Sequence, residues 1–158
     1  MRILMVNASP KKNGATGQVL QWMKEALEEQ YETESVCLGE WSIAFCRGCK
    51  QCYKPGRCVL PADGVEELLH RMERNDAILF AVPSYWGDVP AQFKALIDRC
   101  TPYADTNPLP GHPRPAAGKR VFALPQRCAP GGGQASASTF CNAWNTGADI
   151  WGRNTTAA

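Results

Sequence analysis

Four cysteines lie within thirteen residues of this chain. They are Cys46, Cys49, Cys52 and Cys58, in the segment CRGCKQCYKPGRC, with the spacing C-x2-C-x2-C-x5-C. Four thiolates so close in sequence can converge on one small inorganic core, as a cubane iron–sulfur cluster requires. A disulfide framework usually spreads its cysteines so that they join distant loops. The spacing therefore favours a redox metal centre.

Two other interpretations of this segment stay open. The four cysteines could bind one zinc ion, although structural zinc sites usually separate two cysteine pairs by a longer stretch. They could also be free thiols in a basic loop. The cations interleaved with them are Arg47, Lys50, Lys54 and Arg57. Their charges would offset that of a tetrathiolate cluster, but a solvated basic loop has the same composition.

Length and composition limit the class of protein. The chain has 158 residues and a formal net charge of +2, from 17 basic and 15 acidic residues, so we expect a single domain (1–158) that binds no nucleic acid. No apolar run is long enough to cross a bilayer. The first ten residues resemble a strand more than a signal peptide, which predicts a cytoplasmic protein. In that reducing compartment eight cysteines favour metal or redox chemistry over disulfides. We expect Cys37 and Cys100 to be core residues, and assign no role to Cys128 and Cys141.

The apolar pattern alternates between strands and helices. We expect strands at residues 3–7, 34–38, 77–82, 120–124 and 148–151. We expect a first helix capped by Thr16 and a second capped by the pair Asp63 and Glu66. A third helix should start at Pro90, and a fourth should span 135–144. This alternation predicts a doubly wound, five-stranded parallel sheet in a three-layer α/β fold. Ligands of such sheets bind beyond the carboxyl ends of the strands, where strand order reverses.

The loop after the first strand has the composition of a phosphate site. It reads SPKKNGAT, and its Ser9, Asn13 and Thr16 precede or begin a helix, with Gly14 allowing a tight turn. Hydroxyls, an amide and a helix N-terminus suit a terminal phosphate. The loop lacks G-x-G-x-x-G and G-x-x-x-x-G-K-[ST], so dinucleotide and Walker sites have little support. An ordinary capped turn remains an equal alternative.

Two further loops follow later strands. The first, PSYWGDVPAQFKALIDR, contains Tyr85 and Trp86, which could lie against a planar ring, and Gly87, which permits close backbone approach. Aromatic lids over the core are the alternative. The second, CAPGGGQAS, has three consecutive glycines whose backbone amides could face a ligand, unless it is a flexible surface loop.

These motifs, in this order over roughly residues 1–133, resemble the flavodoxin-like NADPH-dependent FMN reductase superfamily. The cysteine spacing is similar to that of its iron–sulfur flavoprotein branch. The resemblance implies a flavodoxin-like sheet, one FMN, a [4Fe–4S] cluster that passes electrons to the flavin, and a homodimer or homotetramer. The chain ends in DIWGRNTTAA, without an amphipathic segment, so we expect the fold to lack the last helix of the family.

The resemblance also assigns residues. The FMN phosphate would be held by Ser9, Lys11, Asn13, Ala15 and Thr16. The isoalloxazine ring would be flanked by Pro83, Ser84, Tyr85, Trp86 and Gly87, and on its other side by Gly131, Gly132 and Gly133. The cluster ligands would be Cys46, Cys49, Cys52 and Cys58.

The leading hypothesis is an FMN-dependent oxidoreductase or electron-transfer flavoprotein with a [4Fe–4S] cluster. The second is a cluster-free NAD(P)H-dependent FMN or quinone reductase, and the third is a non-catalytic metal- or thiol-binding module on a flavodoxin scaffold. The flavin would carry the chemistry, so no catalytic side chain is expected. His70 and His112 lie outside any catalytic or metal pattern. Expected partners are a small-molecule electron acceptor or a redox protein such as a ferredoxin, with no nucleic acid and no membrane.

Overall fold

A computed structural model describes residues 1–104, 107–112 and 114–126, in which strands and helices alternate. The elements are β1 (Arg2–Asn7), α1 (Ala15–Leu27), β2 (Glu32–Cys37), α2 (Gly64–Arg74), β3 (Ala77–Pro83), α3 (Ala91–Arg99) and β4 (Arg120–Gln126). Single turns of 3-10 helix are η1 (Leu38–Glu40), η2 (Gln51–Tyr53) and η3 (Thr101–Tyr103). The helix expected at 135–144 and the strand expected at 148–151 lie outside the described residues.

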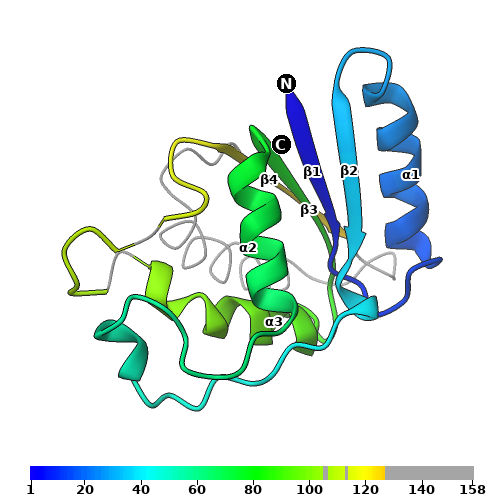
Figure 1. The fold of residues 1–158 in the computed structure, drawn as a ribbon. Helices are drawn as coiled ribbons and strands as arrows, with labels where there is room; N and C mark the ends of the chain where they lie inside the picture. Colours follow the sequence, from blue (N-terminus) through cyan, green and yellow to red (C-terminus); the bar gives the residue numbers. More distant parts are fainter. Residues whose placement is uncertain (105–106, 113, 127–158) are drawn as a thin grey trace.

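The described strands form one parallel sheet in the order β2-β1-β3-β4 (Figure 1). This order is the beginning of the flavodoxin-like order, so the predicted fold class is confirmed. Asn7 at the end of β1 is in register with Cys37 of β2 and Ala81 of β3. The chain turns to opposite sides of β1 to form β2 and β3. Strand order therefore reverses between β1 and β3, and the loops that follow these strands share one edge.

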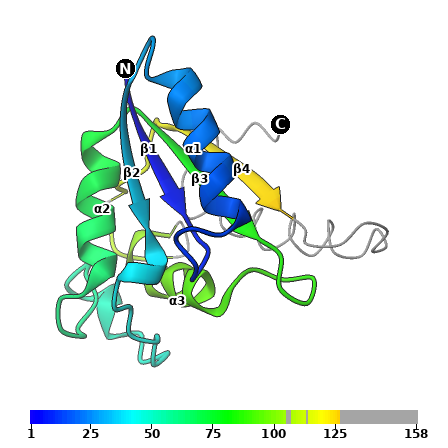
Figure 2. The same ribbon diagram turned by 90° about the vertical axis from the view of Figure 1, so that its right-hand side faces the viewer.

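Helices cover both faces of the sheet (Figure 2). All seven residues of β3 are buried, as expected for a central parallel strand. Leu4, Val6 and Ile78 belong to the core under α2 and α3. On the other face, Met5 and Leu79 pack with Leu20 of α1. None of the described helices is long and apolar enough to cross a bilayer.

Helix starts differ from the sequence prediction in two places. The N-cap of α1 is Gly14, not Thr16, which lies inside the first turn and is buried. Pro90 occupies the N-cap of α3 instead of its first helical position, because its ψ of 144° is extended. The capping pair of α2 is confirmed: Asp63 Oδ1 accepts from the Val65 amide at 3.0 Å, and Glu66 Oε2 accepts from the Asp63 amide at 3.1 Å.

Candidate cofactor site

The loop after β1 is shaped by its own polar side chains. The Ser9 amide donates to Asn7 Oδ1 at 2.9 Å, and the Lys11 amide donates to Ser9 Oγ at 3.1 Å. Asn7 Nδ2 donates to the Lys12 carbonyl at 3.3 Å. The Ser9 hydroxyl keeps its own proton to donate. Asn7, which sequence reasoning missed, therefore orders the same loop as Ser9.

The N-terminus of α1 is available to an anion. Its N-cap, Gly14, makes no side-chain cap hydrogen bond, and the first turn has no acidic residue, unlike α2 with its capping box. The first amides of a helix have no intrahelical acceptor and carry a partial positive charge. Gly17 brings the loop close to this turn, because a Cβ there would lie 1.9 Å from the Lys12 carbonyl oxygen. Its signal in the sequence was a glycine inside a helix, where it lowers helix propensity.

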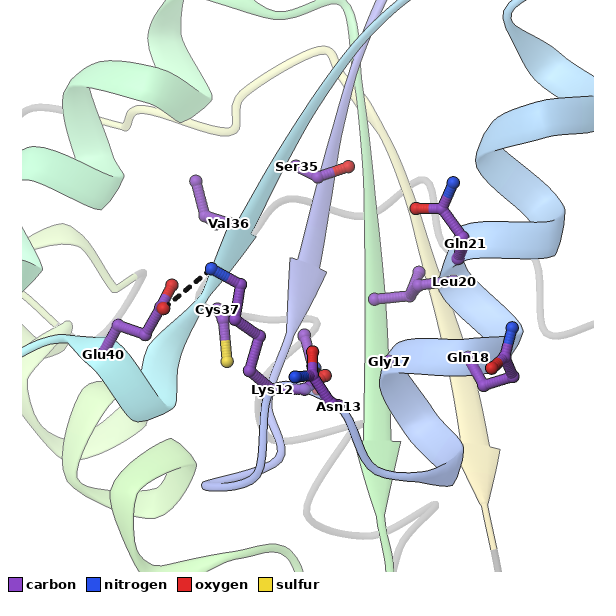
Figure 3. Close-up of a pocket in the computed structure, with 11 residues that line it drawn as sticks. Lys12, Asn13, Gly17, Gln18, Leu20, Gln21, Ser35, Val36, Cys37 and Glu40 are labelled. Atoms are coloured by element: carbon purple, nitrogen blue, oxygen red, sulfur yellow. Dashed lines mark hydrogen bonds and ion pairs between the residues drawn. The ribbon is translucent and has the colours of Figure 1, made fainter.

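A cavity of about 390 Å³ lies beside this loop, between α1 and β2 (Figure 3). Asn13 lines it, whereas Ser9, Lys11, Ala15 and Thr16 do not. Lys12 Nζ and Glu40 Oε1 form an ion pair of 2.8 Å at its wall. That hydrogen bond and the charge of Glu40 raise the pKa of Lys12. No residue of the aromatic turn after β3 is among those that line this cavity, so the two are separate.

The turn after β3 presents Trp86 to solvent. The Tyr85 amide donates to the Asp88 carbonyl at 2.8 Å, and the Asp88 amide donates to the Tyr85 carbonyl at 3.0 Å. Both central residues have positive φ, 53° at Trp86 and 79° at Gly87, as in type I′ turns. Trp86 is fully exposed and Tyr85 is 42% exposed. Trp86 is therefore not a lid over the core, and the fold holds it outward in a conformation that costs about 1–2 kcal/mol.

The structure brings the loops after β1 and β3 to the same edge. The Ala8 amide donates to the Ala81 carbonyl at 2.9 Å, just beyond the paired residues. Pro83 ends β3 and is buried, while the Ser84 amide donates to the Gln126 carbonyl at the end of β4 at 2.7 Å. The glycines predicted on the other side of the ring, residues 131–133, lie outside the described residues.

The four clustered cysteines line a single cavity of about 220 Å³. Cys46 and Cys49 are exposed, Cys58 is partly buried and Cys52 is buried. The Gly48 amide donates to Cys46 Sγ at 3.4 Å. Burial raises the pKa of the Cys52 thiol, with smaller contributions from Cys58 and the other two clustered cysteines. The structure therefore gathers the four predicted ligands around one space.

The remaining described cysteines lie elsewhere in the core. Cys37 and Cys100 are buried, as predicted. Cys128 and Cys141 are outside the described residues. Among the residues that the structure describes, no three side chains of His, Cys, Asp or Glu converge closely enough to hold a single metal ion.

Arg99 at the end of α3 also lines the cysteine cavity, and sequence reasoning missed it. It follows Phe93 and Leu96 at three-residue intervals and is fully buried with them. That periodicity was its signal, because a cation on an apolar helix face requires a buried partner.

The strand order, with helices on both faces of the sheet, defines a flavodoxin-like α/β protein. Residues 1–148 match the family described as NADPH-dependent FMN reductase. The chain belongs to this family, which confirms the family expected from its motifs.

Individual relatives agree with this assignment. An iron–sulfur flavoprotein of Methanocaldococcus jannaschii is 35% identical over 103 residues, which are 65% of this chain and 53% of that protein. One from Archaeoglobus fulgidus is 35% identical over 112 residues, 70% of this chain and 50% of that protein. The chain thus spans about half the length of these curated relatives. The solved NAD(P)H:quinone oxidoreductase of Methanothermobacter marburgensis superposes with a TM-score of 0.73 at 20% identity, covering 100% of this chain and 82% of that one, and supports the fold.

Proposed function

We propose that this chain is the FMN-binding part of an oxidoreductase in which Cys46, Cys49, Cys52 and Cys58 hold a [4Fe–4S] cluster that passes electrons to the flavin. The observation that carries the proposal is the cavity lined by all four cysteines. The segment that carries these cysteines lies at the same end of the sheet as the loops after β1 and β3 (Figure 1). The relatives named iron–sulfur flavoproteins support it as well.

The cavity suits a cluster better than a single ion. In a cubane cluster each thiolate binds a different iron, so the four sulfur atoms surround a space, whereas zinc draws four ligands to one point. Arg47, Lys50 and Arg99 line the same cavity. Their positive charges would offset the negative charge of a tetrathiolate cluster.

The edge beside β1 and β3 suits FMN. The free amides at the start of α1, with Ser9, Lys11, Asn13, Ala15 and Thr16 around them, would bind the phosphate. Pro83, Ser84, Tyr85, Trp86 and Gly87 would orient the ring, with Trp86 already held outward. When bound, FMN supplies the hydride and single-electron chemistry.

One helix connects the two sites. The aromatic turn immediately precedes α3, and Arg99 at the end of α3 lines the cysteine cavity. At 1.5 Å per residue this nine-residue helix is about 13 Å long. We infer that a redox protein such as a ferredoxin donates electrons at the exposed cysteine segment, and that a small-molecule acceptor receives them at the flavin.

A cluster-free NAD(P)H-dependent FMN or quinone reductase is the second candidate. The observation that favours it is the exposure of Cys46 and Cys49, because free thiols in a surface loop would also be exposed. Here NAD(P)H would be a co-substrate that approaches the exposed turn at Trp86.

The visible absorption spectrum of the anaerobically purified protein separates these functions. Flavin bands with a broad additional absorption that dithionite bleaches are expected for the proposed protein. Flavin bands alone would indicate the cluster-free reductase. The absence of both would indicate a non-catalytic metal- or thiol-binding module.

A further inference from the structure

Arg99 is a buried cation at the rim of the cysteine cavity. Its side chain is 0% exposed, and that of its partner Asp63 is 11% exposed. Arg99 Nη1 donates to Asp63 Oδ2 at 2.6 Å, and Nη2 donates to Asp63 Oδ1 at 3.3 Å. A buried ion pair is costly to desolvate, so stability alone is a weak explanation for its presence beside this cavity.

The pair holds both ends of the cysteine segment. Before the first cysteine, the Ala44 carbonyl accepts from Arg99 Nη1 at 3.0 Å, and the Ala44 amide donates to Asp63 Oδ2 at 2.9 Å. After the last cysteine, Asp63 itself is the N-cap of α2. Arg99 and Asp63 therefore close the loop that runs from residue 44 to residue 63.

The guanidinium also lies beside a predicted ligand. Cys58 and Arg99 line the same cavity. Among the described residues, Arg99 Nε is buried without a hydrogen-bond acceptor. Sulfur atoms bound to iron accept hydrogen bonds, and such bonds shift the potential of a cluster. An acceptor in the cavity would satisfy this donor.

We propose that Arg99 is a positioning residue that closes the cysteine segment through Asp63 and favours the reduced form of the cluster by its charge. This inference rests on the proposed function. In the step concerned, the cluster gains one electron from a one-electron donor, which loses one, and no bond forms or breaks. The gain makes an already negative cluster more negative. A nearby cation therefore stabilises the reduced form more than the oxidised form, and a nearby carboxylate does the opposite.

The test is the midpoint potential of the cluster, followed by electron paramagnetic resonance during anaerobic titration with dithionite. Arg99→Met should make the potential more negative by at least a tenfold change in the reduction equilibrium, which is 59 mV for one electron. Asp63→Asn, which keeps a side chain able to cap α2, should make it less negative. Arg99→Lys keeps the charge, so its potential should lie closer to that of the wild type than the potential of Arg99→Met does. Lysine cannot reproduce the two-pronged contact with Asp63, so Arg99→Lys should contain less iron per chain than the wild type.

A double variant and a matched control complete the test. The double variant Arg99→Met with Asp63→Asn leaves no unpaired buried charge, so it should fold even if Arg99→Met alone does not. Its midpoint potential should lie closer to that of the wild type than the potential of Arg99→Met does. Arg74→Met removes an exposed arginine at the end of α2 that does not line the cysteine cavity, and it should leave the potential unchanged.

Three outcomes would overturn the inference. With a cluster in the wild type, the role of Arg99 alone would be overturned by no shift in Arg99→Met. It would equally be overturned by an Asp63→Asn potential that is unchanged or more negative. Wild-type protein without iron and sulfide would overturn the proposed function and this inference with it.

Discussion

Trp86 combines full exposure with a left-handed backbone conformation. Both properties are unfavourable for a large apolar side chain, since the first leaves its surface in water and the second crowds its Cβ. Residues with such strain are found preferentially at binding sites, where the surrounding structure enforces it. Trp86 therefore marks the side of the sheet edge where a planar ligand would stack.

Replacing Trp86 should separate stability from binding. We expect Trp86→Gly to leave the unfolding free energy of the apoprotein unchanged, or to raise it by up to about 1 kcal/mol, because glycine relieves the strain. The same variant should bind FMN about fivefold more weakly, as the loss of about 1 kcal/mol of ring stacking implies. Urea unfolding and fluorescence titration with FMN measure the two quantities. Trp22→Ala, at an exposed position on α1, is the control. Destabilisation of Trp86→Gly with unchanged FMN affinity would contradict this role.

Asp63 should make stability depend on pH. Burial opposes its ionisation, but hydrogen bonds from the Ala44 and Val65 amides and from Arg99 lower its pKa below the ordinary value of 3.8. The carboxylate therefore stabilises the fold at pH values above 3.8, and this contribution is lost as the pH falls below 3.8 through the folded-state pKa. We expect Asp63→Asn to lower the unfolding free energy by about 3 kcal/mol at neutral pH, because it breaks a buried pair.

Urea unfolding of the apoprotein over a range of pH checks this expectation. The difference between wild type and Asp63→Asn should be constant above about pH 5 and should narrow towards about pH 3. Glu29→Gln, an exposed change, should alter stability by less than about 0.5 kcal/mol at either pH. A difference that does not vary with pH would show that the Asp63 carboxylate is not preferentially ionised in the folded protein.

The proposed phosphate site depends most on the start of α1. Gly17 is expected to be indispensable there, because an added Cβ would lie 1.9 Å from the Lys12 carbonyl oxygen and force the loop outward. We expect Gly17→Ala to cost about 1–3 kcal/mol of stability and to weaken FMN binding at least tenfold. Gly14→Ala is a matched control, since its Cβ would lie 3.4 Å from the Lys11 carbonyl oxygen. Titration of both variant apoproteins with FMN tests this expectation. Equal FMN affinities of Gly17→Ala and Gly14→Ala would show that the phosphate binds elsewhere.

The elements could be predicted where sequence carries a strong local signal. β3 is apolar at every position, and the Asp63 and Glu66 pair is a recognisable capping box, so both were found with bounds close to the observed ones. The start of α1 was misplaced because Thr16 is an equally good cap by residue type. Gly14 takes that position because the loop folds back, with its amide donating to the Lys11 carbonyl at 3.3 Å.

The long-range contacts of the site could not be predicted. The four cysteines were evident from their spacing, but the pair that closes their loop joins residues 36 positions apart. Nothing in the local sequence indicates that the end of α3 meets the start of α2. Likewise, the clustering of SPKKNGAT and PSYWG at one edge followed from the order of strands, whereas the strained turn at Trp86 did not.

At the scale of the whole molecule, the two faces of the sheet are covered unequally by the described helices. α2 and α3 cover one face and α1 the other, on which Phe122 and Leu124 of β4 are only partly buried (Figure 2). Next to the first and last clustered cysteines, Phe45 is 74% exposed and Val59 is 48% exposed. Exposed apolar surface of this kind favours association. We propose a homodimer or homotetramer with the cysteine segment near a subunit contact.

Size-exclusion chromatography with light scattering at micromolar concentration measures the assembly. We expect a dimer or tetramer, and we expect Phe45→Ser to shift it towards the monomer because it removes apolar surface from the proposed contact. Trp22→Ser, on the outer side of α1, is the matched control. A wild-type monomer with full flavin content would contradict the proposal.

The most direct test of the central claim is the iron, sulfide and flavin content of the anaerobically purified protein and its cysteine variants. The wild type should contain about four iron, about four sulfide and about one FMN per chain. Alanine at Cys46, Cys49, Cys52 or Cys58 should remove or convert the cluster while FMN stays bound, whereas Cys37→Ala should retain both. Stoichiometric zinc without iron, or FMN with neither iron nor sulfide in the wild type, would contradict a [4Fe–4S] flavoprotein.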